Sequence, residues 1–231
     1  SDGFIDRASA RMSSYYASAA FYADNTLIKF QAFGNSEKTY QAWNGVPSYL
    51  LDTDRSYNPC GEYEEDGVKK FYNNQTDNYW QHNYHLMASQ RIGDFWNMNL
   101  TLHYTDGNGY YEDYKSKAKF SSYKLPEYID PEGNTVKKTD LVRRKWLDNY
   151  FYGAVYSANY QHDNTRLTLG TAVNNYVGDH FGWVMWTKSA NVLPQPDYEY
   201  YRNTGKKLDY NAYAKLTQRL SPLFTGYLDL Q

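Results

Sequence analysis

The fold is decided by the stretch WQHNYHLMASQRIGDFWNMNLTLHY, which occupies residues 80–104. Its even positions are mostly apolar and its odd positions mostly polar, and a period of two predicts β-strands with two different faces. Four residues depart from the alternation, namely His82, Met87, Gln90 and Phe95. Gly93 and Asp94 lie between the two alternating arms and favour a tight turn, so the stretch is predicted to form a β-hairpin.

The same pattern recurs along the chain. Alternating arms around short polar turns predict four hairpins, near residues 9–33, 79–105, 146–174 and 207–231. Each arm is about ten residues long, which is roughly what a tilted strand needs to cross a bilayer. The sequence therefore predicts an all-β chain of about eight antiparallel strands in up-and-down order.

The predicted connections differ strongly in length. Two or three residues close one end of each hairpin, whereas the segments 34–78, 105–145 and 175–206 join the hairpins at the other end. Soluble sandwiches spread their loop lengths more evenly, whereas outer-membrane barrels combine short periplasmic turns with long extracellular loops. This asymmetry favours a segment of a transmembrane β-barrel located in a bacterial outer membrane.

The composition fits a boundary between water and an apolar phase. The 231 residues include 27 Tyr, 6 Trp and 10 Phe, yet the mean hydropathy is −0.85. The 24 basic and 26 acidic residues indicate no nucleic-acid partner. Lipid tolerates the apolar stripes but not charges at mid-bilayer, so we expect the even-numbered stripes to face lipid. Rings at the strand ends are expected to form two girdles, with Trp96 and Phe224 on one side and Tyr79, Trp80, Tyr104, Tyr150 and Tyr210 on the other.

Two runs outside the hairpins resemble a known family. The segments Lys38–Pro47 (KTYQAWNGVP) and Leu51–Tyr63 (LDTDRSYNPCGEY) look like an extracellular loop of TonB-dependent receptors of the Bacteroides type. The preceding Asp2–Arg7 (DGFIDR) and the hairpin Tyr79–Tyr104 are similar to barrel strands of the same receptors. The resemblance is most specific over residues 1–115.

The resemblance implies active import of a scarce nutrient, such as an iron chelate, haem, cobalamin or an oligomeric nutrient. Such receptors carry an N-terminal plug and a TonB box, neither of which is found in residues 1–231. We therefore expect the chain to supply part of the barrel wall, with contact to the TonB complex made through other parts of the receptor. Outer-membrane lipids and a small nutrient ligand are the remaining partners that the resemblance implies.

The candidate binding residues are rings in the long connections, because rigid aromatic side chains make good contact surfaces for a ligand or a surface lipoprotein. The alternative for each ring is packing within the loops. The candidates are Tyr40, Trp43, Tyr49, Tyr57, Tyr63, Tyr110, Tyr111, Trp183 and Trp186.

The sequence shows no catalytic motif, so we expect no enzyme. The five histidines are scattered, and Cys60 stands alone in a turn-rich stretch, so no metal site is expected from them. Asp106, Asn108 and Glu112 offer oxygen ligands that calcium accepts, but they lack the spacing of an EF-hand loop. A strand-to-loop turn is the expected structure there.

Two other functions fit the same residues. A soluble, aromatic-rich carbohydrate-binding β-domain would also use exposed rings, and a complete barrel of eight strands would serve a structural or adhesive role. Sugar binding by a detergent-free monomer would favour the first of these. A heat-modifiable gel shift in detergent would favour the second.

Overall fold

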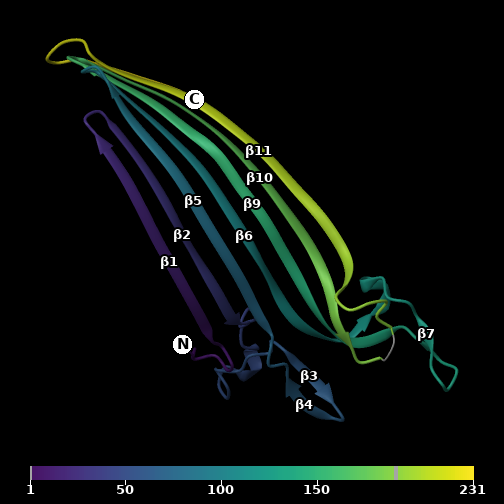
Figure 1. Cartoon of the computed structure of the whole chain (residues 1–231). Helices are drawn as coiled ribbons and strands as arrows, with labels where there is room; N and C mark the ends of the chain where they lie inside the picture. Colours follow the sequence, from purple (N-terminus) through teal and green to yellow (C-terminus); the bar gives the residue numbers. More distant parts are fainter. Residues whose placement is uncertain (1, 190–191) are drawn as a thin grey trace.

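The computed structural model describes residues 2–189 and 192–231 (Figure 1). Long β-strands make up most of the chain, with two short 3₁₀ helices between them. The elements are β1 (Ala10–Ala23), β2 (Thr26–Tyr40), η1 (Ser48–Leu50), β3 (Glu62–Glu65), β4 (Val68–Phe71), β5 (Thr76–Ile92), β6 (Trp96–Lys119), η2 (Phe120–Tyr123), β7 (Tyr128–Ile129), β8 (Thr135–Val136), β9 (Lys138–His162), β10 (Thr165–Thr187), β11 (Tyr198–Arg219) and β12 (Thr225–Leu230).

Eight of these strands form one antiparallel sheet in the order β1-β2-β5-β6-β9-β10-β11-β12. The order of these strands in the sheet is therefore their order along the chain. The two small hairpins β3-β4 and β7-β8 lie in the long connections. The predicted all-β, antiparallel, up-and-down arrangement of eight strands is confirmed. The sheet of the described residues is curved but open, with β1 and β12 as its edges (Figure 1).

The strands are much longer than the predicted ten residues. β6 has 24 residues, β9 has 25 and β10 has 23. The expected long loops are correspondingly shorter, because backbone pairing continues through most of 105–145 and 175–206. The prediction failed there since alternation is visible only where one face is apolar, and in these segments both faces carry polar and aromatic residues.

The tight turns lie at one end of the sheet and the long connections at the other, as Figure 1 shows. Two residues join β1 to β2 and β9 to β10, and three join β5 to β6. Gly93 and Asp163 adopt positive φ angles of 58° and 44° in two of these turns, which residues at tight hairpin turns commonly do. The predicted asymmetry of the connections is confirmed.

One face of the sheet carries an uncovered apolar band. Its middle row crosses seven strands through Ala19, Phe30, Leu86, Leu102, Ala154, Val173 and Tyr210. Leu86 and Leu102 are 45% and 44% exposed, although both lie at the centre of the sheet. The band therefore has no protein cover among the described residues.

Rings border this band on both sides. Trp96 pairs with Tyr160 near the tight turns, and Tyr104 pairs with both Tyr84 and Tyr152 toward the long connections. The nine residues from Trp96 to Tyr104 cover about 26 Å along the strand, which is close to the hydrocarbon thickness that a tilted strand crosses. Tyr79 departs from the girdle prediction, because it lies on the opposite face from its neighbour Trp80.

The other face of the sheet is mostly polar over the same rows, with Phe33, Met87, Phe151 and Val155 as apolar exceptions. Side chains there bridge neighbouring strands, as between Thr105 Oγ1 and Asn83 Oδ1 (2.9 Å) and between His103 Nε2 and Asn174 Oδ1 (2.9 Å). Such hydrogen bonds fix the strands without any apolar core beneath them. The sheet thus has one apolar and one mostly polar surface over the height of the band.

A cluster of buried polar groups ties the connection between β2 and β5 to the sheet. The carboxylate of Glu112, which is 3% exposed, accepts hydrogen bonds from Arg144 Nε (2.6 Å), Asn74 Nδ2 (2.6 Å) and the Tyr72 hydroxyl. Gln41 Nε2 donates to the backbone carbonyl of Glu112 at 3.0 Å. Burial, together with the hydrogen bond to Glu112, raises the pKa of Tyr72.

A small apolar core lies beyond the polar cluster, where η2 and the connection between β10 and β11 fold over the strand ends. It consists of Phe120, Tyr123, Leu125, Leu141, Val184, Val192 and Tyr200. The described residues include no helix that is long and apolar enough to cross a membrane. Burial among the core side chains raises the pKa of Tyr123.

Glu112→Gln is expected to destabilise the fold by about 3 kcal/mol, because it leaves Arg144 facing a neutral group in a buried site. The urea midpoint of the folded protein measures this loss. Glu132→Gln, which changes an exposed loop carboxylate, serves as the control. Equal midpoints for the two variants would show that the cluster does not hold the connection in place.

Candidate functional site

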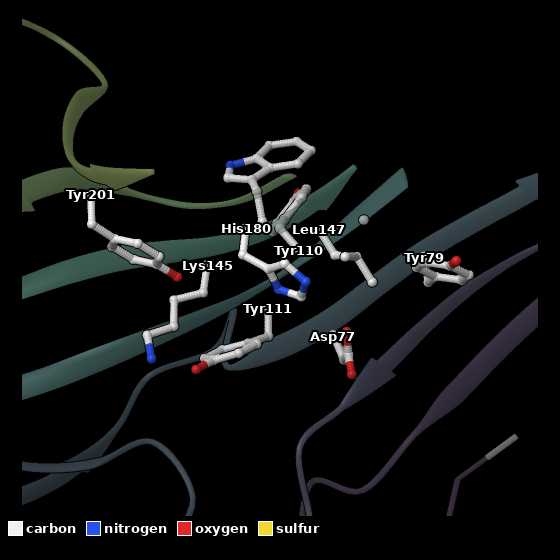
Figure 2. Close-up of a pocket in the computed structure, with 10 residues that line it drawn as sticks. Asp77, Tyr79, Tyr110, Tyr111, Lys145, Leu147, His180 and Tyr201 are labelled. Atoms are coloured by element: carbon white, nitrogen blue, oxygen red, sulfur yellow. The ribbon is translucent and has the colours of Figure 1, made fainter. Parts of the chain in front are cut away.

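A hollow formed by five adjacent strands opens on the polar face, beyond the apolar band. Its volume is about 460 Å³. Its lining residues come from two rows of cross-strand neighbours, each running across the strands of the sheet. One runs through Asp77, Tyr111, Lys145, Gly182 and Tyr201, and the other runs through Tyr79, Gly109, Leu147 and His180. Figure 2 shows these side chains converging from five adjacent strands.

Glycine makes room for the tyrosine walls of the hollow. A Cβ built on Gly109 would lie 2.6 Å from Tyr79 Cδ2, and a Cβ on Gly182 would meet the ring of Tyr201. Both tyrosines therefore lie flat across a neighbouring glycine instead of standing upright from the sheet. The Tyr79 hydroxyl is further held by a hydrogen bond to Asn149 Oδ1 (3.3 Å).

Opposite charges stand on the two sides of Tyr111. Asp77 is on β5 and Lys145 is on β9, with Tyr111 on β6 between them (Figure 2). The Lys145 ammonium lies 5.9 Å from the centre of the Tyr111 ring. Burial, and then the neighbouring carboxylate of Glu37, raise the pKa of Asp77, which stands well beyond the apolar band.

Trp43, in the connection between β2 and β5, contacts the edge of this hollow. Its ring meets Tyr111 edge to face at a centroid distance of 5.2 Å. A second, smaller hollow of about 350 Å³ lies beside it and is lined by Trp43, Tyr111, Asp113 and Arg143, among other residues. Tyr111 is thus common to both hollows.

Of the other loop rings that the sequence marked as ligand contacts, Tyr49, Tyr57 and Tyr63 line a separate hollow of about 420 Å³, whereas Tyr40 lies outside it. Tyr40 is buried, and its hydroxyl donates to the carbonyls of Cys60 (3.2 Å) and Tyr72 (2.9 Å). Tyr57 donates to Glu62, and Tyr63 stacks on Tyr114 at 4.4 Å. Tyr49 is 78% exposed on η1.

Six of the nine predicted loop rings lie on strands instead, with Tyr40 at the end of β2 and Tyr63 on the short strand β3. Tyr110 and Tyr111 belong to β6, and Trp183 and Trp186 belong to β10. The ring of Trp146 lies 4.4 Å from that of Tyr110 and 5.2 Å from that of Trp183, on the face opposite Tyr111. The loop assignment was wrong because the strands extend past the point where their alternation fades.

The proposed calcium ligands also lie on β6 and not on a turn. Asp106 and Glu112 are six residues apart on an extended strand, so their Cα atoms are separated by about 20 Å. Glu112 is already bound by Arg144, and Asp106, Asn108 and Glu112 therefore do not converge on one ion. Over the part of the chain that the structure describes, no three His, Cys, Asp or Glu side chains gather to hold a metal.

Most residues of the hollow were missed from the sequence. Asp77, Lys145 and Tyr201 are more than fifty residues apart from one another, and only the strand pairing places them in one row. Asp77, Tyr79, Tyr111 and Lys145 all occupy odd positions in the sequence. This shared alternation indicates a common face only when the register of the strands is known. His180, which is not among the candidate binding residues of the sequence, also lines the hollow.

Comparisons with known proteins give a likeness among solved structures only. No protein-family model and no curated protein matches the chain. Among solved structures, the ferric preacinetobactin receptor BauA from Acinetobacter baumannii resembles it with a TM-score of 0.48 and 7% sequence identity. That match covers 100% of this chain, which spans only 37% of the length of the receptor.

Gly109→Ala is expected to destabilise the protein by about 1–3 kcal/mol, because the added methyl group collides with the Tyr79 ring and the backbone beside it. The change in melting temperature measures this cost. Gly205→Ala is the matched control, since its Cβ would meet nothing closer than the Gly178 carbonyl at 3.8 Å. A Gly109 variant as stable as the control would mean that Tyr79 does not need this glycine.

Proposed function

We propose that this chain forms part of the wall of an outer-membrane β-barrel that imports a scarce nutrient, with its apolar band against lipid. The uncovered band carries the proposal. Its rows of Leu, Ile and Phe lie between two series of rings, and a tilted strand of this length matches the hydrocarbon layer. Water would be a poor solvent for so large and continuous an apolar surface.

The polar face then lines the interior of the barrel. The hollow around Tyr111 opens on that face, beyond the lipid level on the side of the long connections. We infer that it contacts the nutrient, and that the connections carrying Trp43 and Tyr49 face the outside of the cell. TonB-dependent energy supply and docking of a surface lipoprotein belong to the same proposal.

The open edges fit this arrangement. An unpaired strand edge cannot face hydrocarbon, because each unsatisfied backbone group there costs several kcal/mol. In the proposed wall, β1 and β12 therefore pair with further strands of a larger barrel. A soluble sugar-binding domain, the alternative from the sequence, leaves the band without any cover.

The band is tested by placing a charge on each face of one strand. Leu102→Arg puts a cation in the middle of the apolar band and is expected to cost about 2–4 kcal/mol of folding in a bilayer. Thr101→Arg, one residue away on the polar face, is expected to be tolerated. Folding into lipid vesicles, followed by gel mobility without heating, measures both variants. Equal folding yields would contradict a lipid-facing band.

The orientation is tested by cysteine labelling in intact cells. In a Cys60→Ser background, Tyr49→Cys is expected to react with a membrane-impermeant maleimide, because Tyr49 is exposed at the end with the long connections. Asp94→Cys, in the tight turn between β5 and β6, is expected to react only after the cells are lysed. Labelling of both sites, or of Asp94→Cys alone, in intact cells would exclude the proposed orientation.

A further inference from the structure

Two charged side chains in the hollow have no ion-pair partner among the described residues. Lys145 and Asp77 occupy one row but are two strands apart, which separates their backbones by about 10 Å. In the next row on the same face, Asp113 on β6 holds both Arg143 on β9 (2.8 Å) and Lys115 (2.9 Å). The chain thus pairs its charges next to the hollow and leaves two of them unpaired inside it.

The surroundings of the two charges differ. Asp77 lines one end of the hollow, and the nearby charged group is the carboxylate of Glu37 on the adjacent strand β2. Lys145 and Tyr201 line the other end, with the Lys145 side chain directed toward the Tyr111 and Tyr201 rings, and His180 lines the hollow one row further along the sheet (Figure 2). The hollow therefore has an acidic end and a basic end, separated by the ring of Tyr111.

We propose that the hollow binds a zwitterion whose opposite charges are about 10 Å apart. Its anionic group lies at Lys145, its cationic group lies at Asp77, and its middle packs on Tyr111. A partly buried carboxylate or ammonium gains most from an opposite charge where water is partly excluded. A tripeptide with free ends has this span, since each extended residue covers about 3.5 Å.

The inference rests on the proposed function in one respect, because it takes the polar face to be the nutrient-facing side. The proposed function and the proposed ligand class can be refuted independently of each other. A protein that folds into vesicles but binds no zwitterion refutes only the ligand class. A protein that binds the zwitterion without entering a membrane refutes only the location.

Calorimetry of the full-length protein in detergent micelles tests the ligand class with the peptide Gly-Tyr-Gly. Three forms are compared: free ends, an amidated C-terminus and an acetylated N-terminus. Free ends are expected to bind at least about tenfold more tightly than either capped form, because each cap removes one charge contact. Equal affinity of all three forms, loss of affinity with only one cap, or no binding at all would overturn the proposal.

One variant at each charged residue of the hollow tests which end of the peptide that residue contacts. Lys145→Met is expected to remove the preference for the free over the amidated C-terminus, and Asp77→Asn the preference for the free over the acetylated N-terminus. Lys138→Met and Asp94→Asn, at exposed positions outside the hollow, are expected to keep both preferences. Unchanged preferences in the hollow variants would place the peptide elsewhere and refute the site. Equal gel mobility without heating shows that each variant is folded.

Discussion

The register of the antiparallel sheet is the constraint on which every other feature of this protein depends. Because side chains alternate between faces, a slip of one residue in any strand pair would move apolar residues to the polar face. The register is set at the tight turns, where Ile92 pairs with Trp96, and it continues without interruption to Asp77 and Tyr111. The charged row of the hollow is thus positioned by a turn that lies about 50 Å away along the strand.

The part of the fold near the tight turns could be predicted from the sequence, because one face there must be apolar. Leu86, Leu100 and Leu102 alternate with His85, Asn99 and Thr101, and this pattern alone indicates strands, faces and turns. The outer halves of the same strands carry no such signal. Trp146 and Tyr110 occupy one face and Lys145 and Tyr111 the other, so neither face is apolar and the period of two disappears.

The hollow was beyond sequence reasoning for a related reason. Rings in the long connections suggested a binding surface, but rings serve several purposes here. Tyr40 satisfies buried carbonyls, Tyr63 packs on Tyr114, and Tyr79 fills the space that Gly109 leaves open. Only the pairing of five strands shows that the Tyr111 ring lies between Asp77 and Lys145, whereas the Tyr110 ring packs on Trp146.

The distribution of charges across neighbouring positions also bears on function. Glu112 and Asp113 are almost fully buried, and each is matched by an arginine on β9. Lys145 lies on β9 with those arginines, and Asp77 lies on β5, which is adjacent to β6, yet each lacks an ion-pair partner among the described residues. Leaving a half-buried charge unpaired costs stability, because water solvates it incompletely and no opposite charge compensates. A chain optimised for stability alone would place a cation beside Asp77, as it does beside Asp113. The proposed zwitterion would supply the opposite charges that Asp77 and Lys145 lack among the described residues.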